Sequence, residues 1–386
     1  MNSTFVRDRY TWMLYLLLAF YVYFLNALGP ITPFLKDELG LSYTVSSLHY
    51  SMFALGILLV GVGGGFVVRR LGRWRSLWAG TGAISLMTFL LVFGKSAVVT
   101  ISASFFMGLF SSLIIVIVPL ALSELHGDMR AVAISEANVI ASAVATSAPV
   151  LVGVLARTTL GWRSALVIVA FAPLLMYPLF RSARQAEPAS QQAASVARQK
   201  GLPALYWLYW VCLFLGVSAE FCMISWSADY LKTTLNMRQA DAALSVSLFL
   251  CAMIIGRFSG SRLVQKFSIR RILPASILLA VGGFFLYWAN FNIVLTLAGM
   301  FLTGLGIANL YPLGVSLALS SAGSELVQAS TRASLASGLA ILALPLVLGR
   351  LADAVGIHAA YVVVPTVLLM ALALFGLGEK ITHQAA

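Results

Sequence analysis

The sequence predicts an all-α membrane protein with twelve transmembrane helices, arranged as two pseudo-symmetric halves of six helices. Three observations predict this class: the composition, the length of the apolar runs, and an internal repeat. Of the 386 residues, 60% are apolar and 10% are charged, whereas a soluble domain carries about 25% charged residues. This composition argues against a soluble enzyme, a nucleic-acid binder and a disordered protein.

The apolar runs have the length of membrane spans. A spanning helix needs about 20 apolar residues, and unbroken runs argue against a β-barrel, whose strands alternate apolar and polar residues. The expected spans of the first half lie at about 11–34, 45–68, 75–94, 97–122, 131–156 and 163–180. Those of the second half lie at about 204–229, 242–264, 272–290, 293–319, 329–352 and 358–378. Between them, a segment rich in Ala, Gln and Ser divides the chain into a half at 1–180, a cytoplasmic linker at 181–202, and a half at 203–386.

The basic residues predict the orientation. With the N-terminus in the cytoplasm, 18 of the 25 Lys and Arg fall on the inner side and 7 on the outer side. The positive-inside rule therefore places both termini in the cytoplasm and the chain in the inner (plasma) membrane. The same bias accounts for most of the net charge of +12 without nucleic acid.

No enzyme motif is found in the sequence. There is no phosphate-binding loop, no His-Glu-x-x-His and no Gly-x-Ser-x-Gly, and the four histidines are scattered. We therefore expect no catalytic residues, no cofactor and no metal, and energy for any transport has to come from a gradient.

An internal repeat relates the two halves at an offset of 196 residues. Four matches carry it: Pro149 and Gly153 with Pro345 and Gly349, Phe34-Leu35-Lys36 with Tyr230-Leu231-Lys232, Gly108 with Gly304, and 70–75 with 266–271. Six spans restore the orientation, so the halves are related in parallel. Two such halves suit alternating access, in which they rock about a site between them.

The segment after span 2 resembles the loop motif of the major facilitator superfamily, Gly-x3-Asp-Arg-x-Gly-Arg-Arg. The matching positions here are Gly65, Arg69, Arg70, Gly72, Arg73 and Arg75. The resemblance covers nearly the whole chain and implies a monomeric transporter in which spans 1, 4, 7 and 10 line a central cavity. Arg69 stands where the family has an acid thought to latch the halves in the outward-open state. Glu124, Asp128 and Glu136 are alternative sources of that acid.

Residues in spans 4 and 5 give information on the direction of transport and on its coupling to protons. Ala148-Pro149-x-x-Val152-Gly153 is similar to the Gly-Pro-x-x-Gly-Gly pattern of antiporters in the family, which favours export. The alternative is a helix kink at Pro149 and Gly153 packed against a small-residue surface, and Pro345 and Gly349 are the matching helix-kink residues in span 11. In span 4, Ser104 stands where many proton-coupled members have an arginine, so that mechanism does not carry over directly.

Glu220 is the candidate for proton coupling because it lies deep in span 7, where an ionised carboxylate is unfavourable. It also serves as a candidate for substrate binding; the alternative is a protonated side chain bonded to a neighbouring helix. Asn26 in span 1 lies at a similar depth and either faces Glu220 or bonds its own backbone. Further cavity candidates are Ser111, Ser112, Asn138, Asn309 and Tyr311, for which helix packing is the alternative.

Glu136 and Arg332 are repeat mates near the inner ends of spans 5 and 11. They form either an ion pair between the halves, which breaks in one state, or separate charges that reach the water.

Together these features predict a secondary active transporter for a small organic solute, coupled to protons, with a lean towards export by antiport. A neutral or cationic solute is favoured because no Arg or Lys lies in the middle of an expected cavity helix. The expected partners are the solute, protons and membrane lipid, with no nucleic acid. A proton-independent uniporter, an importer and a non-transporting receptor are the alternatives.

Overall fold

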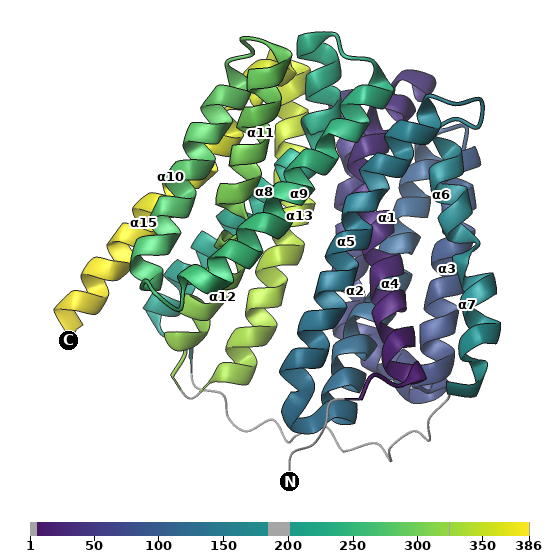
Figure 1. Ribbon diagram of the computed structural model, residues 1–386, viewed down its shortest axis with the longest axis horizontal. Helices are drawn as coiled ribbons and strands as arrows, with labels where there is room; N and C mark the ends of the chain where they lie inside the picture. The colour runs from purple at the N-terminus through teal and green to yellow at the C-terminus, as the bar shows by residue number, and fades with distance from the viewer. Residues whose placement is uncertain (1–5, 184–200, 324, 386) are drawn as a thin grey trace. The chain divides into compact units, whose positions relative to one another are not determined.

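The computed structural model describes residues 6–183, 201–323 and 325–385 of the chain, without the side chains of 60–67, 69, 327 and 383–385 (Figure 1). Every secondary-structure element in these ranges is a helix. The predicted all-α class is therefore confirmed.

The first half of the chain begins with long helices and ends with short ones. Its elements are α1 (Arg9–Leu39), α2 (Tyr43–Leu71), α3 (Arg73–Phe93), α4 (Ala97–His126), η1 (Gly127–Met129), α5 (Arg130–Ala156), α6 (Arg163–Ala170), α7 (Ala172–Phe180) and η2 (Arg181–Ala183). The break between α6 and α7 falls at Phe171, just before Pro173 at the start of α7. A proline in the first turn of a helix is well tolerated, because its missing N–H has no partner there.

The second half contains the elements α8 (Ala204–Leu235), α9 (Gln239–Leu263), α10 (Ile269–Trp288), α11 (Ile293–Ile307), α12 (Leu310–Ser320), α13 (Leu326–Val355), α14 (Ile357–Ala360) and α15 (Val363–Ala385). The expected span at 293–319 is thus two helices, α11 and α12, with Asn309 at the break.

Ten helical segments among the described residues are long and apolar enough to cross a membrane, which supports a multi-pass protein. One of them, Ala97–Ala156, is 60 residues long and contains both α4 and α5, and the first part of α2, Tyr43–Leu59, is apolar as well. Twelve spans stay a prediction.

The chain forms two compact units. Unit 1 comprises Met1–Ile31 and Met52–Ala193, and unit 2 comprises Thr32–Ser51 and Ala194–Ala386. Helices α1 and α2 therefore contribute residues to both units. The division into halves at the 181–202 linker stays a prediction.

The 196-residue repeat extends to helix packing inside each unit. In unit 1, a Cβ on Gly108 of α4 would overlap the backbone of Phe53 in α2. In unit 2, a Cβ on Gly304 of α11 would lie 2.7 Å from the carbonyl oxygen of Phe249 in α9. Phe53 and Phe249 are themselves 196 residues apart. Small residues let membrane helices approach closely. Gly108 therefore allows the close crossing of α4 with α2 in unit 1, and its repeat mate Gly304 allows the equivalent crossing of α11 with α9 in unit 2.

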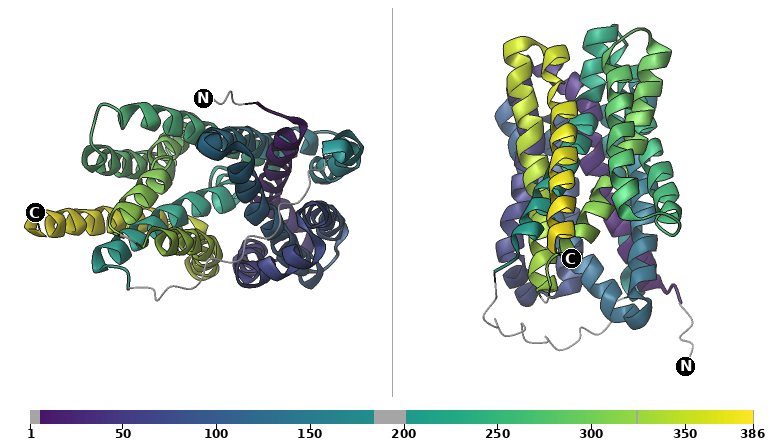
Figure 2. Two further views of the ribbon diagram at one scale, coloured as in Figure 1. Left: turned by 90° about the horizontal axis from the view of Figure 1, so that it is seen from below. Right: turned by 90° about the vertical axis from the view of Figure 1, so that its left-hand side faces the viewer.

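Helix α8 packs against α12, α13 and α15 in unit 2 (Figure 2, with α15 in yellow). Side-chain donors on α8 bind backbone carbonyls of α13: the Tyr206 hydroxyl donates to Ala329 (2.7 Å), and the Trp226 indole donates to Pro345 (3.0 Å). These bonds hold α13 along α8. The carboxyl-terminal part of α13 therefore lies beside Trp226 of α8 and Tyr43 of α2.

Candidate functional site

The tip of the α1–α2 hairpin, Thr32–Ser51, belongs to unit 2. Helix α1 ends at Leu39, and Gly40 follows with a φ of 61°, a left-handed conformation that favours glycine. The Leu41 N–H then donates to the Lys36 carbonyl (2.9 Å), which closes the helix end as in a Schellman motif. The tight turn keeps the end of α1 close to the start of α2.

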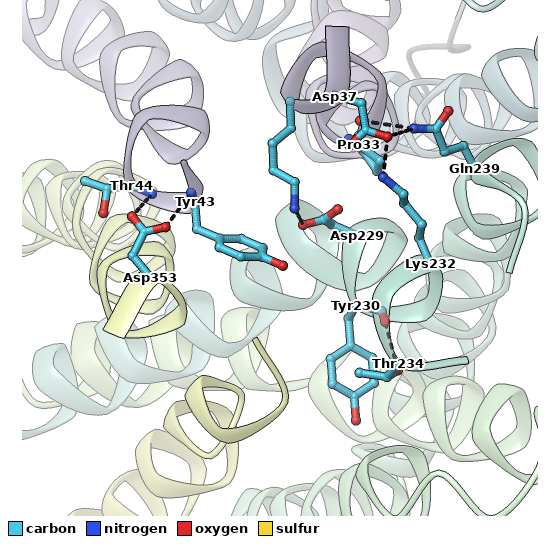
Figure 3. A network of polar contacts seen from close by, with 11 residues as sticks. Pro33, Asp37, Tyr43, Thr44, Asp229, Tyr230, Lys232, Thr234, Gln239 and Asp353 are labelled. Atoms are coloured by element: carbon cyan, nitrogen blue, oxygen red, sulfur yellow. Dashed lines mark hydrogen bonds and ion pairs between the residues drawn. The ribbon is translucent and has the colours of Figure 1, made fainter. Parts of the chain in front are cut away.

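Six polar side chains join this tip to α8, α9 and α13, and we call them the hairpin cluster. They are Lys36, Asp37, Asp229, Lys232, Gln239 and Asp353. Figure 3 shows how the carboxylates of Asp37, Asp229 and Asp353 lie among donors from neighbouring elements.

Asp229 is the most buried member of the hairpin cluster. Its side chain is 0% exposed, and its Oδ2 accepts a hydrogen bond from the Nζ of Lys36 at 2.6 Å. Lys36 is 13% exposed, and its ammonium also lies 3.7 Å from the centroid of the Tyr43 ring. The other carboxylate oxygen of Asp229, Oδ1, is buried and accepts no hydrogen bond from the described residues. One ammonium group therefore holds a carboxylate that water does not reach.

Asp37 makes the second ion pair of the cluster. Its Oδ2 accepts from the Nζ of Lys232 and from the Nε2 of Gln239, both at 2.5 Å, and the same amide donates to the Pro33 carbonyl (3.3 Å). This pair is more open to water: the Asp37 side chain is 44% exposed. Lys36 and Lys232 are repeat mates. Lys36 of α1 pairs with Asp229 of α8, and Lys232 of α8 pairs with Asp37 of α1.

Asp353 of α13 caps the start of α2. Its two carboxylate oxygens accept the backbone N–H groups of Tyr43 and Thr44, each at 2.8 Å. These are the first two residues of α2, whose N–H groups have no partner within the helix. A carboxylate at this end is also favoured by the helix dipole.

Gly349 allows α13 to come close to the hairpin tip. A Cβ on Gly349 would lie 2.8 Å from the Tyr43 carbonyl oxygen and 3.0 Å from both the Ser47 hydroxyl and the Trp226 ring. Trp226 in turn donates to the carbonyl of Pro345. The two residues expected at a helix kink in span 11 thus lie where α13 meets α8 and the start of α2.

Glu220 lies in the middle of α8 and is paired. Arg257 of α9 donates from Nη2 to Glu220 Oε1 at 3.2 Å, and the carboxylate is mostly buried. A bond from Glu220 to a neighbouring helix is the alternative that the sequence leaves open, and in the structure the donor is the charged side chain of Arg257. The guanidinium group of Arg257 compensates the negative charge of Glu220 within this apolar helix.

The other cavity candidates bond mainly to their own helices. Side chains donate to carbonyls three or four residues earlier: Asn26 to Val22 (2.9 Å), Ser111 to Met107 (2.6 Å), Ser112 to Leu109 (2.5 Å) and Asn138 to Ile134 (2.9 Å). Asn309 is buried at the α11–α12 break beside Gly260, where a Cβ would overlap its amide, and Tyr311 is partly exposed. Their roles in a cavity stay predictions.

The loop motif forms the α2–α3 turn in unit 1. Gly72 has a φ of 77° between the two helices. Arg73 forms a bidentate pair with Glu124 of α4, at 2.5 and 2.9 Å, and Arg70 and Arg75 are exposed. Gly65 and Arg69 lie in α2, outside the residues whose side chains are described.

Glu136 and Arg332 each have partners within their own unit. Arg7 donates to both carboxylate oxygens of Glu136, at 2.6 and 2.8 Å. Arg332 lies over the Trp207 ring, 5.1 Å from its centroid. Pro149 and Gly153 are buried further along α5, the helix that carries Glu136.

The hairpin cluster was not predicted as a site, although the sequence contains a signal for it. The repeat match of Lys36 with Lys232 indicates by itself only that the chain has two related halves. Each lysine has an acid nearby, Asp37 and Asp229, which is the pattern of two reciprocal pairs. Finding the partners requires knowing which helix ends meet.

Comparison with known proteins gives a family and a fold. The family model described as Major Facilitator Superfamily matches residues 13–287 and 209–384 of the chain. A glucose/galactose transporter of Brucella abortus is 31% identical over 172 residues, which cover 44% of this chain and 41% of that protein. Membrane protein MosC of Rhizobium meliloti is 29% identical over 150 residues, or 39% of this chain and 37% of that protein. The matched segments thus span less than half the length of these relatives.

Solved structures match over nearly the full length. A bacterial homolog to the human lysosomal transporter Spinster, in an inward-facing and occupied conformation, has a TM-score of 0.82 at 15% identity and covers 96% of both chains. A mutant form of the nucleoside transporter NupG has a TM-score of 0.77 at 12% identity, with 96% of this chain and 98% of that one covered. At such identities the likeness is one of fold.

Proposed function

The chain belongs to the Major Facilitator Superfamily, and from this premise we propose that it is a secondary active transporter that moves a small organic solute across the inner membrane by alternating access. A family of membrane transporters also accounts for the many large apolar side chains that are exposed on the described helices. The observation that carries the proposal is the hairpin cluster.

Helices α1 and α2 run without a break through Ile31–Thr32 and Ser51–Met52, where the two units divide. In α1 this boundary lies between Pro30 and Pro33, where the missing backbone N–H groups let the helix bend, whereas α2 contains no proline between Tyr43 and Leu71. We therefore propose that α2 transmits movement of one unit to the hairpin tip and pulls the tip away from α8, α9 and α13. The contacts to be broken are ion pairs and hydrogen bonds, which water can replace. These are the properties of a gate.

The Glu220–Arg257 pair favours a neutral solute over a cation. An unpaired carboxylate in span 7 would attract a cation, but Arg257 compensates its charge at 3.2 Å. Two similar proteins are named for neutral, hydroxyl-rich solutes, glucose and galactose in one case and nucleosides in the other. We therefore propose a neutral solute of sugar or nucleoside size as the substrate class.

The direction proposed is export, driven by protons, because of the antiporter-like pattern around Pro149 and Gly153. Two observations support a proton-independent uniporter as the second candidate. Ser104 replaces the arginine of many proton-coupled relatives, and Glu220 is paired with Arg257.

Counterflow in proteoliposomes tests the proposal. Vesicles containing the purified chain are loaded with unlabelled glucose, galactose or a nucleoside, and entry of the labelled solute is followed without a pH gradient. Alternating access predicts transient accumulation of label for at least one solute. A solute that stabilises the protein against heat yet shows no counterflow would indicate a receptor and contradict transport.

A further inference from the structure

We propose that Asp229 is the proton-binding carboxyl group of this protein, and that it takes up its proton when the hairpin tip withdraws Lys36. The proposal rests on the proposed transport function and deepens it, since it names the coupling residue and ties coupling to the gate. It places coupling at the end of α8, away from Glu220.

The geometry of Asp229 carries the argument. Its carboxylate is fully buried, and the described residues give it one side-chain donor, the Lys36 ammonium at 2.6 Å. Oδ1 is buried and accepts no hydrogen bond among the described residues. Removing one partner of a buried ion pair leaves an uncompensated charge, which is strongly unfavourable. Protonation of Oδ1 removes that charge.

The step balances in charge and atoms. While the hairpin tip is bound, the Asp229 carboxylate and the Lys36 ammonium neutralise each other. When the tip leaves, a hydronium ion of the adjoining water gives a proton to Oδ1, and Lys36 keeps its own protons and is hydrated. When the tip returns, the Lys36 ammonium takes the place of that proton, which is released to the opposite side of the membrane, so that one proton crosses per cycle. Asp229 lies six residues before the end of α8 at Leu235, about 9 Å at 1.5 Å per residue. Water therefore reaches the carboxyl group over a short distance once the tip has moved.

Other titratable and charged groups lie around this end of α8, and most of them have polar partners, whereas the buried Tyr287 hydroxyl has none among the described residues. The groups are Lys36 and Asp37 on α1, Tyr43 on α2, Lys232 on α8, Arg238 and Asp241 on α9, Tyr287 on α10, Asp353 on α13 and His358 on α14. Asp353 binds two backbone N–H groups, and Asp37 binds Lys232 and Gln239. Arg238 pairs with Asp241, and the Tyr230 hydroxyl contacts His358 at 3.0 Å. Among the described acids at this end of α8, Asp229 differs in having a buried oxygen without a donor.

The test compares gradient-driven accumulation with counterflow in Asp229→Asn, which mimics the protonated state in nearly the same volume. A pH difference of one unit across the vesicle membrane supports up to about tenfold accumulation at one proton per solute. We expect the unmodified protein to accumulate solute for one sign of the gradient. Asp229→Asn is expected to show an accumulation ratio of about 1 for both signs, while counterflow continues at a rate altered by the loss of the Lys36 ion pair.

Two further variants sharpen the result. Asp229→Glu keeps a titrating carboxyl group and is expected to retain accumulation; it also serves if the asparagine variant does not fold. Asp241→Asn removes an acid at the same end of unit 2 and is the matched control, expected to accumulate solute as the unmodified protein does.

The outcomes separate the two proposals. Absence of counterflow in the unmodified protein would overturn the transport function itself. Counterflow together with undiminished accumulation in Asp229→Asn would overturn the role of Asp229 alone. Loss of accumulation in Glu220→Gln, with Asp229→Asn still driven by the gradient, would assign coupling to Glu220.

A distance measurement gives a readout that does not depend on transport. Spin labels on Glu38→Cys in α1 and Thr233→Cys in α8 report the separation of the hairpin tip from α8 inside unit 2. Lowering the pH is expected to shift the unmodified background towards longer distances. Asp229→Asn is expected to show the longer distances already at neutral pH. An unchanged pH response in that variant would contradict the proposal.

Discussion

The ion pairs around the α1–α2 turn differ from those near the α2–α3 and α4–α5 turns. In the hairpin cluster, Lys36 and Asp229 are largely or fully buried, and the pair joins helices through residues 193 positions apart in sequence. In unit 1, the Arg73–Glu124 and Arg7–Glu136 pairs are bidentate but partly exposed. Exposed pairs contribute little to stability because water and salt screen them, whereas a buried carboxylate depends on its partner.

The comparison indicates that the two groups of charges serve different ends. In the unit 1 pairs, the charged groups are partly exposed and water can hydrate them when a pair is broken. Loss of such a pair therefore changes the free energy of unfolding little. The hairpin cluster holds the tip of one helical hairpin against three helices, and part of its charge is buried by that contact. Its stability is therefore linked to whether the tip is bound. The following predictions test this difference in order of decreasing effect.

Lys36→Met should produce the largest loss of stability, because the buried Asp229 side chain then either keeps a charge without a cation or has to take up a proton. Breaking a buried pair on one side lowers the free energy of unfolding by about 3–5 kcal/mol. Thermal unfolding in detergent, followed by tryptophan fluorescence, measures the change. The double variant Lys36→Met/Asp229→Leu replaces both charges with apolar groups and should recover most of the loss. If the double variant were as unstable as the single one, the buried charge would not be the cause.

Gly349→Ala should lower the free energy of unfolding by about 1–3 kcal/mol, the usual range for overpacking a close contact. The added Cβ would lie 2.8 Å from the Tyr43 carbonyl oxygen. Gly376→Ala in α15 is the matched control, since a Cβ there meets no atom within 4 Å. That control should be neutral or slightly stabilising, because alanine favours helix over glycine. Equal effects at the two glycines would show that α13 does not depend on this close approach.

Asp353→Ala should loosen the start of α2 by about 1 kcal/mol, as expected for the loss of a capping group. The amides of Tyr43 and Thr44 lose their acceptors and should exchange with deuterium about fivefold faster, which is the same free energy expressed as a rate. Amides near the end of α9 serve as the internal reference. Unchanged exchange at the start of α2 would contradict the capping role.

Glu124→Gln should have the smallest effect, about 0–1 kcal/mol, because its pair with Arg73 is partly exposed. Added salt should reduce even this difference, while the effect of Lys36→Met should change little with salt because a buried pair is poorly screened. Unfolding of both variants in low and high salt provides the measurement. A loss in Glu124→Gln as large as that in Lys36→Met would remove the distinction between the two groups of ion pairs.

Much of the fold could be predicted because apolar run length and loop charge are local properties. The helix that begins at Ala204 follows directly from hydropathy, whereas the single span expected at 293–319 is divided at Asn309 in the structure. The candidate site was harder to predict. Glu220 was recognisable because an acid interrupts an apolar run, but its partner Arg257 lies on another helix. Asp229 and Lys36 looked like ordinary charges near helix ends, since burial cannot be seen from neighbours in sequence.

By itself, the sequence determined the helical class, the approximate spans, the repeat at an offset of 196 residues and the family, because each depends on residue type and spacing along one chain. The tertiary structure decided which helix ends meet, and hence that Lys36 neutralises Asp229 while Lys232 neutralises Asp37. It also decided that Asp229 is shielded from water. The energy of a charge depends on what surrounds it in space, and in this protein those surroundings come from segments far away along the chain.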